Sequence, residues 1–307
     1  MSAYPSGCLG KLPLHGDFIR FNAASPEVHE LDHWVQEGIY HGYQDLGQRW
    51  DGAFDTAPSA RFIYTSPRNH RVVAGLFRPS VDKAGRRYPF LVYTMLDAAA
   101  LGADLGYLPF ALEPFLAKAT EVAMWADSAI NLNTFLTAFD SLRFEPDLAE
   151  ARRAFARFVL GKTAGGLWAS LFGAEGDARR VAAVQAVADG PEQRQGTALR
   201  LPLNEPVAEA AFWTELTRRL NRAKSMPTMV MWNERGGETP ARLHLAFGEL
   251  SPRCFLPFVL PTRADTGLRD FSAPAAAGKG GAFDAVLNET SLKLSDLLQR
   301  LPRCKGI

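Results

Sequence analysis

Hydrophobic positions first recur at helical spacing after Ser25. Pro26 and Glu27 follow this serine: Ser is a good N-cap, Pro fits the first helical turn, and Glu favours the positive end of the helix dipole. Apolar or small residues then repeat every three or four positions, which predicts one buried helix face. The stripe consists of Val28, Leu31, Val35, Gly38 and Ile39.

Further helices are predicted by the same periodicity in the middle and at the end of the chain. One carries a stripe from Leu112 to Ala123, and another begins at Pro146-Asp147 and continues to Val159. Gly173 is placed to end a helical segment over 167–172 because glycine adopts the left-handed C-cap conformation. Two more helices are predicted over 205–222 and along the leucines 294, 297, 298 and 301.

Short runs of β-branched and aromatic residues, separated by turn residues, predict strands. Three of them follow one another closely, and this spacing favours antiparallel pairing. A loop with a short extended piece is expected over 189–204, and a mobile Gly/Ala-rich segment over 263–282. The predicted strands span residues 60–65, 71–78, 88–96, 228–232, 241–247 and 254–260.

The order helix, strands, helices, strands, helix predicts an α+β fold. We expect a mixed, largely antiparallel sheet with helices packed on its faces and with strands drawn from both ends of the chain. Strand and helix do not alternate strictly, which disfavours a doubly wound nucleotide-binding fold. We predict an N-terminal domain over residues 1–140 and a helical and strand-rich C-terminal region over 141–307, whose strands can complete the same sheet.

Composition narrows the classes of function. Of 307 residues, 34 are Lys or Arg and 33 are Asp or Glu, so no charge excess is present to hold a nucleic-acid backbone. Cys8, Cys254 and Cys304 are far apart and form no CxxC pair, which favours a reducing compartment over a disulfide framework. Without a signal peptide or a long apolar run, we expect a cytoplasmic protein with no membrane insertion. Its oligomeric state is open.

One motif suggests catalysis. His29-Glu30-Leu31-Asp32-His33 fits HExxH, in which two histidines one helical turn apart bind zinc and the glutamate serves as base. Both histidines fall opposite the apolar stripe, and the extended motif would need Gly and His where Gln36 and Ile39 stand. We therefore read a polar helix face, assign no catalytic residue, metal or cofactor, and keep a zinc-dependent hydrolase as the alternative.

A second motif resembles the end of a phosphate-binding loop. Gly161-Lys162-Thr163 has Ala156 where such a loop needs glycine, and helix precedes it instead of a strand. We interpret the motif as a junction between a helix and a loop. The competing hypothesis is a nucleotide-dependent switch that binds phosphate through this motif.

Two segments combine Gly and Pro with charged residues at the margin of the predicted strands. They read GKLPLHGDF over 10–18 and PSVDKAGRRYPF over 79–90. Structural turns are one interpretation, because Gly, Pro and Asp each favour turn geometry. A shared polar rim for binding another protein is the other, with Asp17 and Asp82 available to pair with lysine or arginine. The candidate partner-binding residues are Lys11, His15, Asp17, Ser80, Asp82, Arg86 and Arg87.

The same two segments resemble the N-terminal signatures of the TagF/ImpM family, which is associated with type VI secretion. Trp34, Gly47 and Trp50 follow in the family's order, and the resemblance extends over residues 7–97. It implies a cytoplasmic accessory protein that represses assembly of the secretion system after translation. The implied partner is the forkhead-associated scaffold protein Fha, and the family supplies no agreed catalytic residues. Residues 226–232 resemble the family's C-terminal strand more weakly.

Overall fold

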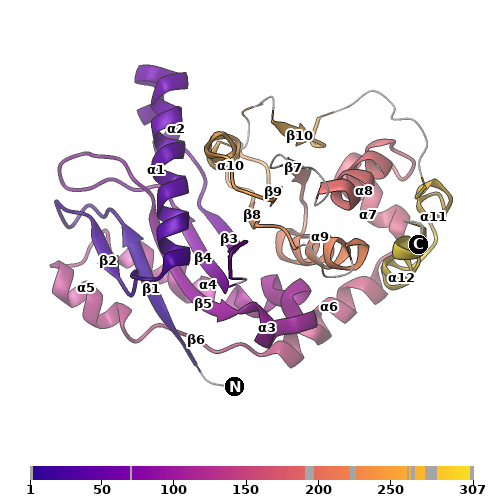
Figure 1. The fold of residues 1–307 in the computed structure, drawn as a ribbon, viewed down its shortest axis with the longest axis horizontal. Helices are drawn as coiled ribbons and strands as arrows, with labels where there is room; N and C mark the ends of the chain where they lie inside the picture. The colour runs from indigo at the N-terminus through magenta and orange to yellow at the C-terminus, as the bar shows by residue number, and fades with distance from the viewer. Residues whose placement is uncertain are drawn as a thin grey trace.

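A single mixed sheet runs through the protein (Figure 1). The computed structural model describes residues 3–69, 71–190, 197–221, 226–260, 263, 267–273 and 282–304. Within these residues the sheet has ten strands in the order β10-β7-β9-β8-β3-β4-β5-β1-β2, and β6 also pairs with β1. The strands are β1 (Tyr4–Gly10), β2 (Ile19–Phe21), β3 (Ala60–Thr65), β4 (Arg71–Arg78), β5 (Phe90–Asp97), β6 (Arg143–Phe144), β7 (Thr197–Pro202), β8 (Met229–Asn233), β9 (Arg242–Phe247) and β10 (Leu268–Asp270).

The sheet joins the two ends of the chain through one antiparallel pair. β8 lies beside β3, with Phe62 opposite Met231, so the later strands continue the sheet begun by the early ones. Every pair is antiparallel except β10 with β7, which is parallel. This arrangement confirms the predicted α+β class with a largely antiparallel sheet. The domain division near residue 140 stays a prediction.

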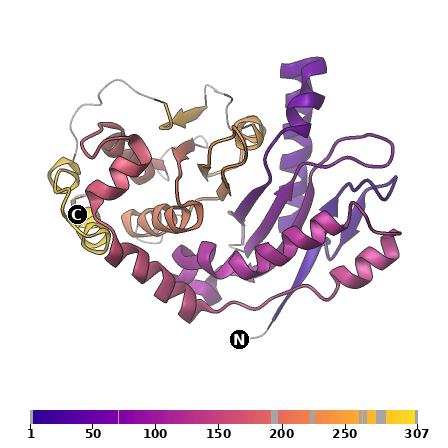
Figure 2. The same ribbon diagram turned by 180° about the vertical axis from the view of Figure 1, so that it is seen from behind.

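Helices cover both faces of the sheet. On the face seen in Figure 1, α1 (Pro26–Leu46) and α10 (Phe255–Val259) pack on the strands together with α2 (Trp50–Asp55). On the other side, as Figure 2 shows, lie helices from the middle of the chain and from its C-terminal end. These are α4 (Leu108–Trp125), α5 (Leu132–Phe139), α6 (Leu148–Gly161), α7 (Ala164–Phe172), α8 (Arg179–Asp189), α9 (Pro206–Leu220) and α12 (Leu294–Cys304).

Strand alternation divides the core into two layers. In β3, Phe62 and Tyr64 point to the α1 side while Ile63 points to the α4 side, as the twofold period of a strand requires. Because both faces are covered, each central strand is almost wholly buried. Short helices complete the chain: α3 (Ala98–Leu101), α11 (Asp284–Leu287), and the 3₁₀ turns η1 (Gly47–Arg49), η2 (Gly102–Tyr107) and η4 (Pro252–Cys254). No helix in the described ranges has the length and apolar character needed to span a membrane.

The predicted helix boundaries are confirmed where a capping residue marks them. The Ser25 hydroxyl accepts a hydrogen bond from the Val28 N–H at the start of α1, and the Asp147 carboxylate accepts one from the Glu150 N–H at the start of α6. Gly173 ends α7 with φ of 87°. The phosphate-loop look-alike is the junction between α6 and α7, where Lys162 ends one helix and Thr163 caps the next.

The predicted strand over 254–260 is wrong. Ser251 caps η4 and Pro252 starts it, and the chain continues as the short helix α10, buried on every side. A short apolar run carries no period that separates a buried strand from a buried helix. Residues 263–282 were expected to be mobile, but 268–270 form β10; most of the rest of that segment lies outside the described residues.

Strand β1 was not predicted because Gly7 and Gly10 interrupt its signal, and β2 was not predicted because it has only three residues. At Gly10 φ is 128°, and a Cβ atom would lie 2.0 Å from the Pro89 carbonyl oxygen, so only glycine allows the chain to leave the sheet there. Gly75 in β4 is equally close to the Val92 carbonyl oxygen. Both glycines serve close packing between strands.

Candidate functional site

The two signature segments meet in space. We call residues 11–18, between β1 and β2, and 79–89, between β4 and β5, the signature loops; they lie together at one end of the sheet, on the left in Figure 1. The Lys83 N–H donates to the His15 carbonyl oxygen at 3.1 Å, and the Arg86 guanidinium donates to the Gly16 carbonyl oxygen. The two segments therefore lie against each other in the fold, and their role in binding a partner stays a prediction.

Asp82 organises both loops. Its Oδ1 accepts from the Ala84 N–H at 2.9 Å and from the Arg86 N–H at 2.8 Å, which closes the turn of its own loop. Its Oδ2 accepts from Arg86 Nε at 2.7 Å and lies 3.1 Å from Lys11 Nζ on the other loop. Of the pairings considered from the sequence, Asp82 with Lys11 and Arg86 is the one that forms.

The electrostatics match this geometry. The Asp82 side chain has no exposed surface, and burial by itself would raise its pKa. Hydrogen bonds from the Arg86 backbone, Lys11 and the Arg86 side chain outweigh burial and lower the pKa of Asp82 to about 2. Asp82 is therefore a carboxylate at neutral pH and stabilises the conformation of its loop. A group with so low a pKa is poorly suited to transfer protons near neutral pH.

Arg87 points to a different partner. Its guanidinium donates two hydrogen bonds to the Asp55 carboxylate, at 2.9 and 2.7 Å, and lies 3.0 Å from the Asp51 carboxylate. Both acids belong to α2, so Arg87 anchors the second loop to that helix. Tyr43 on α1 donates to Asp51 at 3.0 Å and extends the contact. Arg87 was one of several bases available to Asp17 or Asp82 from the sequence, and the structure pairs it with the acids of α2 instead.

A third connection runs from the second loop to α1. The Tyr88 hydroxyl donates to the Asp32 carboxylate, which also accepts from Arg20 at 2.6 Å. The rings of Tyr88 and Phe18 meet edge to face, with centroids 4.8 Å apart. Helix α1 thus forms the base on which the signature loops rest. The sequence showed Asp32 only as a charged residue inside HExxH.

Exposure separates the candidate residues into two groups. Ser80 and Asp82 are buried, and Lys11 is 14% exposed at its side chain, so these three support the loops from inside. Asp17 and Arg86 are exposed, and His15 and Arg87 are partly so. Lys83 is also exposed and was missing from the sequence-based set. Its place in the turn, two residues before Gly85, was the signal that could have found it.

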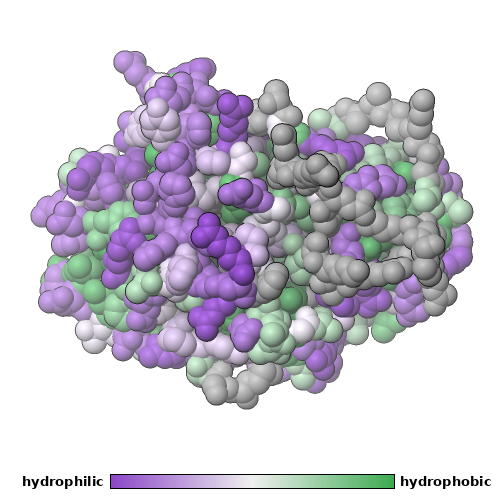
Figure 3. Space-filling model, viewed as in Figure 1, coloured by the Kyte–Doolittle hydropathy of each residue, from purple (hydrophilic) through white to green (hydrophobic). Residues whose placement is uncertain are grey.

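The HExxH residues form no metal-binding group. His29 and His33, near the start of α1, are exposed, as expected for the polar face of this helix. At the other, projecting end of α1 and at α2, Figure 3 also shows mostly hydrophilic side chains. Glu30 accepts hydrogen bonds from Tyr64 at 2.7 Å and Ser66 at 3.0 Å and pairs with Arg68. Across the described ranges, no group of three His, Cys, Asp or Glu side chains is arranged to hold a metal. The zinc alternative gains no support.

Sequence reasoning missed a buried charged cluster around Arg200 in β7. Its guanidinium donates to His244 Nε2 at 3.0 Å, to Asp270 at 2.9 Å and to the Pro257 carbonyl oxygen at 2.9 Å. Burial, together with the charges of Arg200 and Arg242, lowers the pKa of His244 well below its usual value. Arg200 therefore ties β7, β9, β10 and α10 together, through residues far apart in the sequence.

Two comparisons with known proteins found matches, one to a family model and one to a solved structure. Residues 7–142, which contain both signature loops and α1, match the model of the TagF N-terminal domain, described as type VI secretion system-associated. The crystal structure of PA0076 from Pseudomonas aeruginosa PAO1 resembles the fold with a TM-score of 0.54 and 18% sequence identity. That match covers 90% of this chain and 100% of that one. No curated protein matched.

The matched residues include the two loops that Asp82, Lys11 and Arg86 join. Over residues 7–142, the chain is therefore similar to the TagF N-terminal domain, which is type VI secretion system-associated.

Proposed function

We propose that this protein is a post-translational repressor of type VI secretion system assembly, which acts by binding a cytoplasmic component such as the forkhead-associated scaffold protein. The observation that carries the proposal is the Asp82-centred junction within the residues that match the TagF N-terminal domain. It fixes two loops as one surface and leaves the charged side chains of Asp17, Lys83 and Arg86 outside.

Rigidity favours binding at this surface. A flexible loop would lose conformational entropy on docking, whereas loops that are already held by internal hydrogen bonds lose little. Exposed charges at the edge of an interface contribute to specificity and to the rate of association. The buried polar groups of the junction form hydrogen bonds and ion pairs with one another. A partner would therefore contact the exposed side chains of Asp17, Lys83 and Arg86.

The direct test measures binding of the purified forkhead-associated scaffold protein to variants of the exposed residues. Lys83→Glu and Asp17→Lys change the surface without removing a side-chain hydrogen bond that the structure contains. We expect each to weaken binding by about tenfold or more, while thermal unfolding changes little because exposed substitutions usually shift stability by about 0.5 kcal/mol or less. Arg235→Glu, in the exposed loop between β8 and β9, is the matched control.

Two results would contradict the proposal. One is scaffold binding that is absent in the intact protein, or that survives Lys83→Glu and Asp17→Lys unchanged. The other comes from cells: deletion of the gene should increase secretion, and a deletion strain with ordinary secretion would remove the repressor role.

A further inference from the structure

A cavity opens where four helical elements meet, away from the signature loops. It has a volume of about 340 Å³ and is lined by residues of η2, α6, α9 and α12. Figures 1 and 2 both show α12 at one side of the molecule and the signature loops at the other. The Tyr107 ring lies beside the Phe155 ring, with centroids 4.9 Å apart. Together with the buried side chains of Val159 and Leu298, these rings give the cavity an apolar wall.

Two arginines, Arg152 of α6 and Arg219 of α9, line this space, which we call the arginine cavity. Arg152 donates two hydrogen bonds to the Asp104 carboxylate, at 2.5 and 2.6 Å, and Arg219 Nε donates to the Glu215 carboxylate at 2.6 Å. These bonds fix both guanidinium groups in place. Arg152 Nη1 and Arg219 Nη2 donate to no group that the structure describes, so each arginine keeps donors for a ligand.

The charges around the arginine cavity do not cancel. Arg218 also donates to Glu215, at 2.7 and 2.8 Å, so two arginines share that carboxylate. Three arginines therefore face two carboxylates, which leaves one positive charge in excess, and the other residues lining the cavity are uncharged. The Asp104 and Glu215 side chains are 9% and 0% exposed, whereas those of Arg152 and Arg219 are 60% and 30% exposed. A ligand thus meets the positive groups before the acids.

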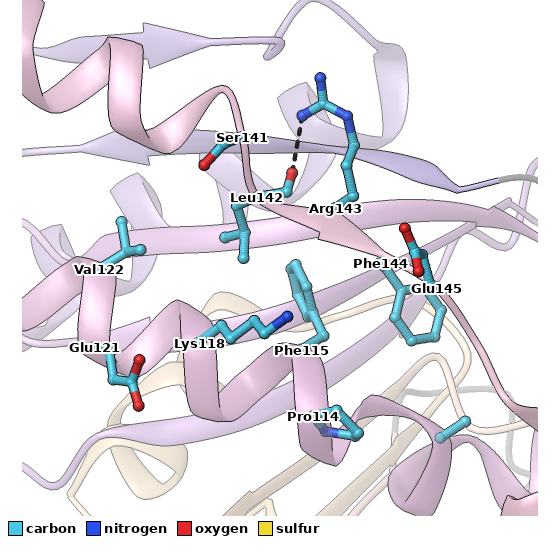
Figure 4. Close-up of a pocket in the computed structure, with 11 residues that line it drawn as sticks. Pro114, Phe115, Lys118, Glu121, Val122, Ser141, Leu142, Arg143, Phe144 and Glu145 are labelled. Carbon is cyan, nitrogen blue, oxygen red and sulfur yellow. Dashed lines mark hydrogen bonds between the residues drawn. The ribbon is translucent and has the colours of Figure 1, made fainter.

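A larger cavity, of about 540 Å³ between α4 and β6, has no such excess. Figure 4 shows Lys118 on α4, with Arg143 and Glu145 on the segment opposite. Its two bases, Lys118 and Arg143, are balanced by Glu121 and Glu145, and Arg143 also pairs with Asp140 at 3.8 Å. The larger cavity therefore selects no sign of charge, and Lys118 provides a matched control for the smaller one.

We propose that the arginine cavity binds a small organic acid, with one carboxylate on Arg152 and Arg219 and an apolar body against the cavity wall. A single excess positive charge matches a single carboxylate, and guanidinium groups bind carboxylates through charge-assisted hydrogen bonds. Ser295 and Gln299, which also line the cavity, add a hydroxyl and an amide that can hydrogen-bond to the ligand. The volume lies within the range of small-molecule sites, roughly 300–1,000 Å³. The inference does not depend on the proposed function, which concerns the signature loops.

The experiment titrates the full chain with three probes and follows binding by saturation-transfer NMR. Phenylacetate carries a carboxylate on an aromatic ring, phenylacetamide has the same shape without the charge, and acetate has the charge without the ring. We expect saturable binding of phenylacetate that weakens as salt is added. Phenylacetamide and acetate should each bind at least about tenfold more weakly, a difference of about 1.4 kcal/mol.

Two variants test the assignment of the site. Gln299→Glu adds a negative charge to the cavity at constant size and removes no side-chain hydrogen bond that the structure contains, so phenylacetate affinity should fall at least about tenfold. Arg219→Gln should lower it similarly. Thermal unfolding checks that this variant still folds, because Arg218 remains to pair with Glu215. Lys118→Gln removes one positive charge from the larger cavity and should bind within about twofold of the original chain.

Four outcomes would overturn the proposal. Phenylacetate that shows no saturable binding would remove the site, and phenylacetamide that binds equally well would remove the role of the arginines. Unchanged phenylacetate affinity in Gln299→Glu would place the ligand elsewhere. A loss in Lys118→Gln as large as in Gln299→Glu would show attraction by the charge of the whole protein instead of by this cavity.

Discussion

Replacing Asp82 by asparagine tests the junction that supports the candidate site. Asparagine has nearly the same shape, so Oδ1 can still accept from the Ala84 and Arg86 N–H groups. The other oxygen becomes an NH₂ donor facing Arg86 Nε and Lys11 Nζ, which are donors as well. The substitution therefore removes two charge-assisted hydrogen bonds and leaves a largely buried ammonium group without its counter-charge.

The expected cost follows from those two losses. A hydrogen bond to a charged group contributes about 1.5–3 kcal/mol, and breaking a buried pair from one side costs about 3–5 kcal/mol. Because the Arg86 side chain is 57% exposed and can turn to water, we expect the lower end, about 2–3 kcal/mol in the free energy of unfolding. Urea unfolding at pH 7 measures it. Asp17→Asn, an exposed acid on the other signature loop, is the control, with an expected change below about 0.5 kcal/mol.

The pH dependence gives an independent check. The pKa of Asp82 is about 2 in the folded protein and near 3.8 in the unfolded chain. A lowered pKa means that its stabilisation is complete above pH 3.8 and is lost as pH falls toward 2. The gap between the original chain and Asp82→Asn should thus be constant from pH 7 to 5 and shrink by pH 3. A variant as stable as the original, or a gap that widens in acid, would refute the supporting role of Asp82.

Two further predictions concern the sheet. His244 accepts a hydrogen bond from Arg200 only when the imidazole is neutral, and its pKa is lowered in the folded state. The free energy of unfolding should therefore fall as pH drops below 6.5. In His244→Gln, whose side chain can still accept a hydrogen bond but does not titrate, the urea midpoint should decline less between pH 7 and pH 5. Gly75→Ala should lower the free energy of unfolding by roughly 3 kcal/mol or more, because the new Cβ atom would lie 2.0 Å from the Val92 carbonyl oxygen. The control is Gly52→Ala in α2, where a Cβ atom meets nothing within 4 Å, so thermal unfolding should show an unchanged or higher stability. Equal effects of the two alanines would contradict the packing argument.

The sequence was sufficient wherever local chemistry decides the outcome. Ser25 with Pro26, Asp147 and Gly173 mark helix ends because a cap acts on backbone groups within one turn of itself. The strands over 60–65 and 71–78 were predicted at their observed limits because they are long, β-branched and bounded by turn residues. The signature loops could also be located from the sequence, because Gly, Pro and Asp each favour the backbone geometry of a turn.

The sequence did not reveal the contacts between residues that lie far apart along the chain. Strand β1 needs glycine at residues 7 and 10 to let Tyr93 and Pro89 approach, so its sequence reads as a loop until the neighbouring strand is present. The run over 254–260 is equally apolar as strand or helix, and its packing against α1 decides for helix. Whether Asp82 is an exposed contact or a buried support, and whether Arg87 pairs with it or with α2, likewise depends on which loops meet. Hydrogen bonds and ion pairs act over a few ångströms in space, and only the folded chain sets those distances.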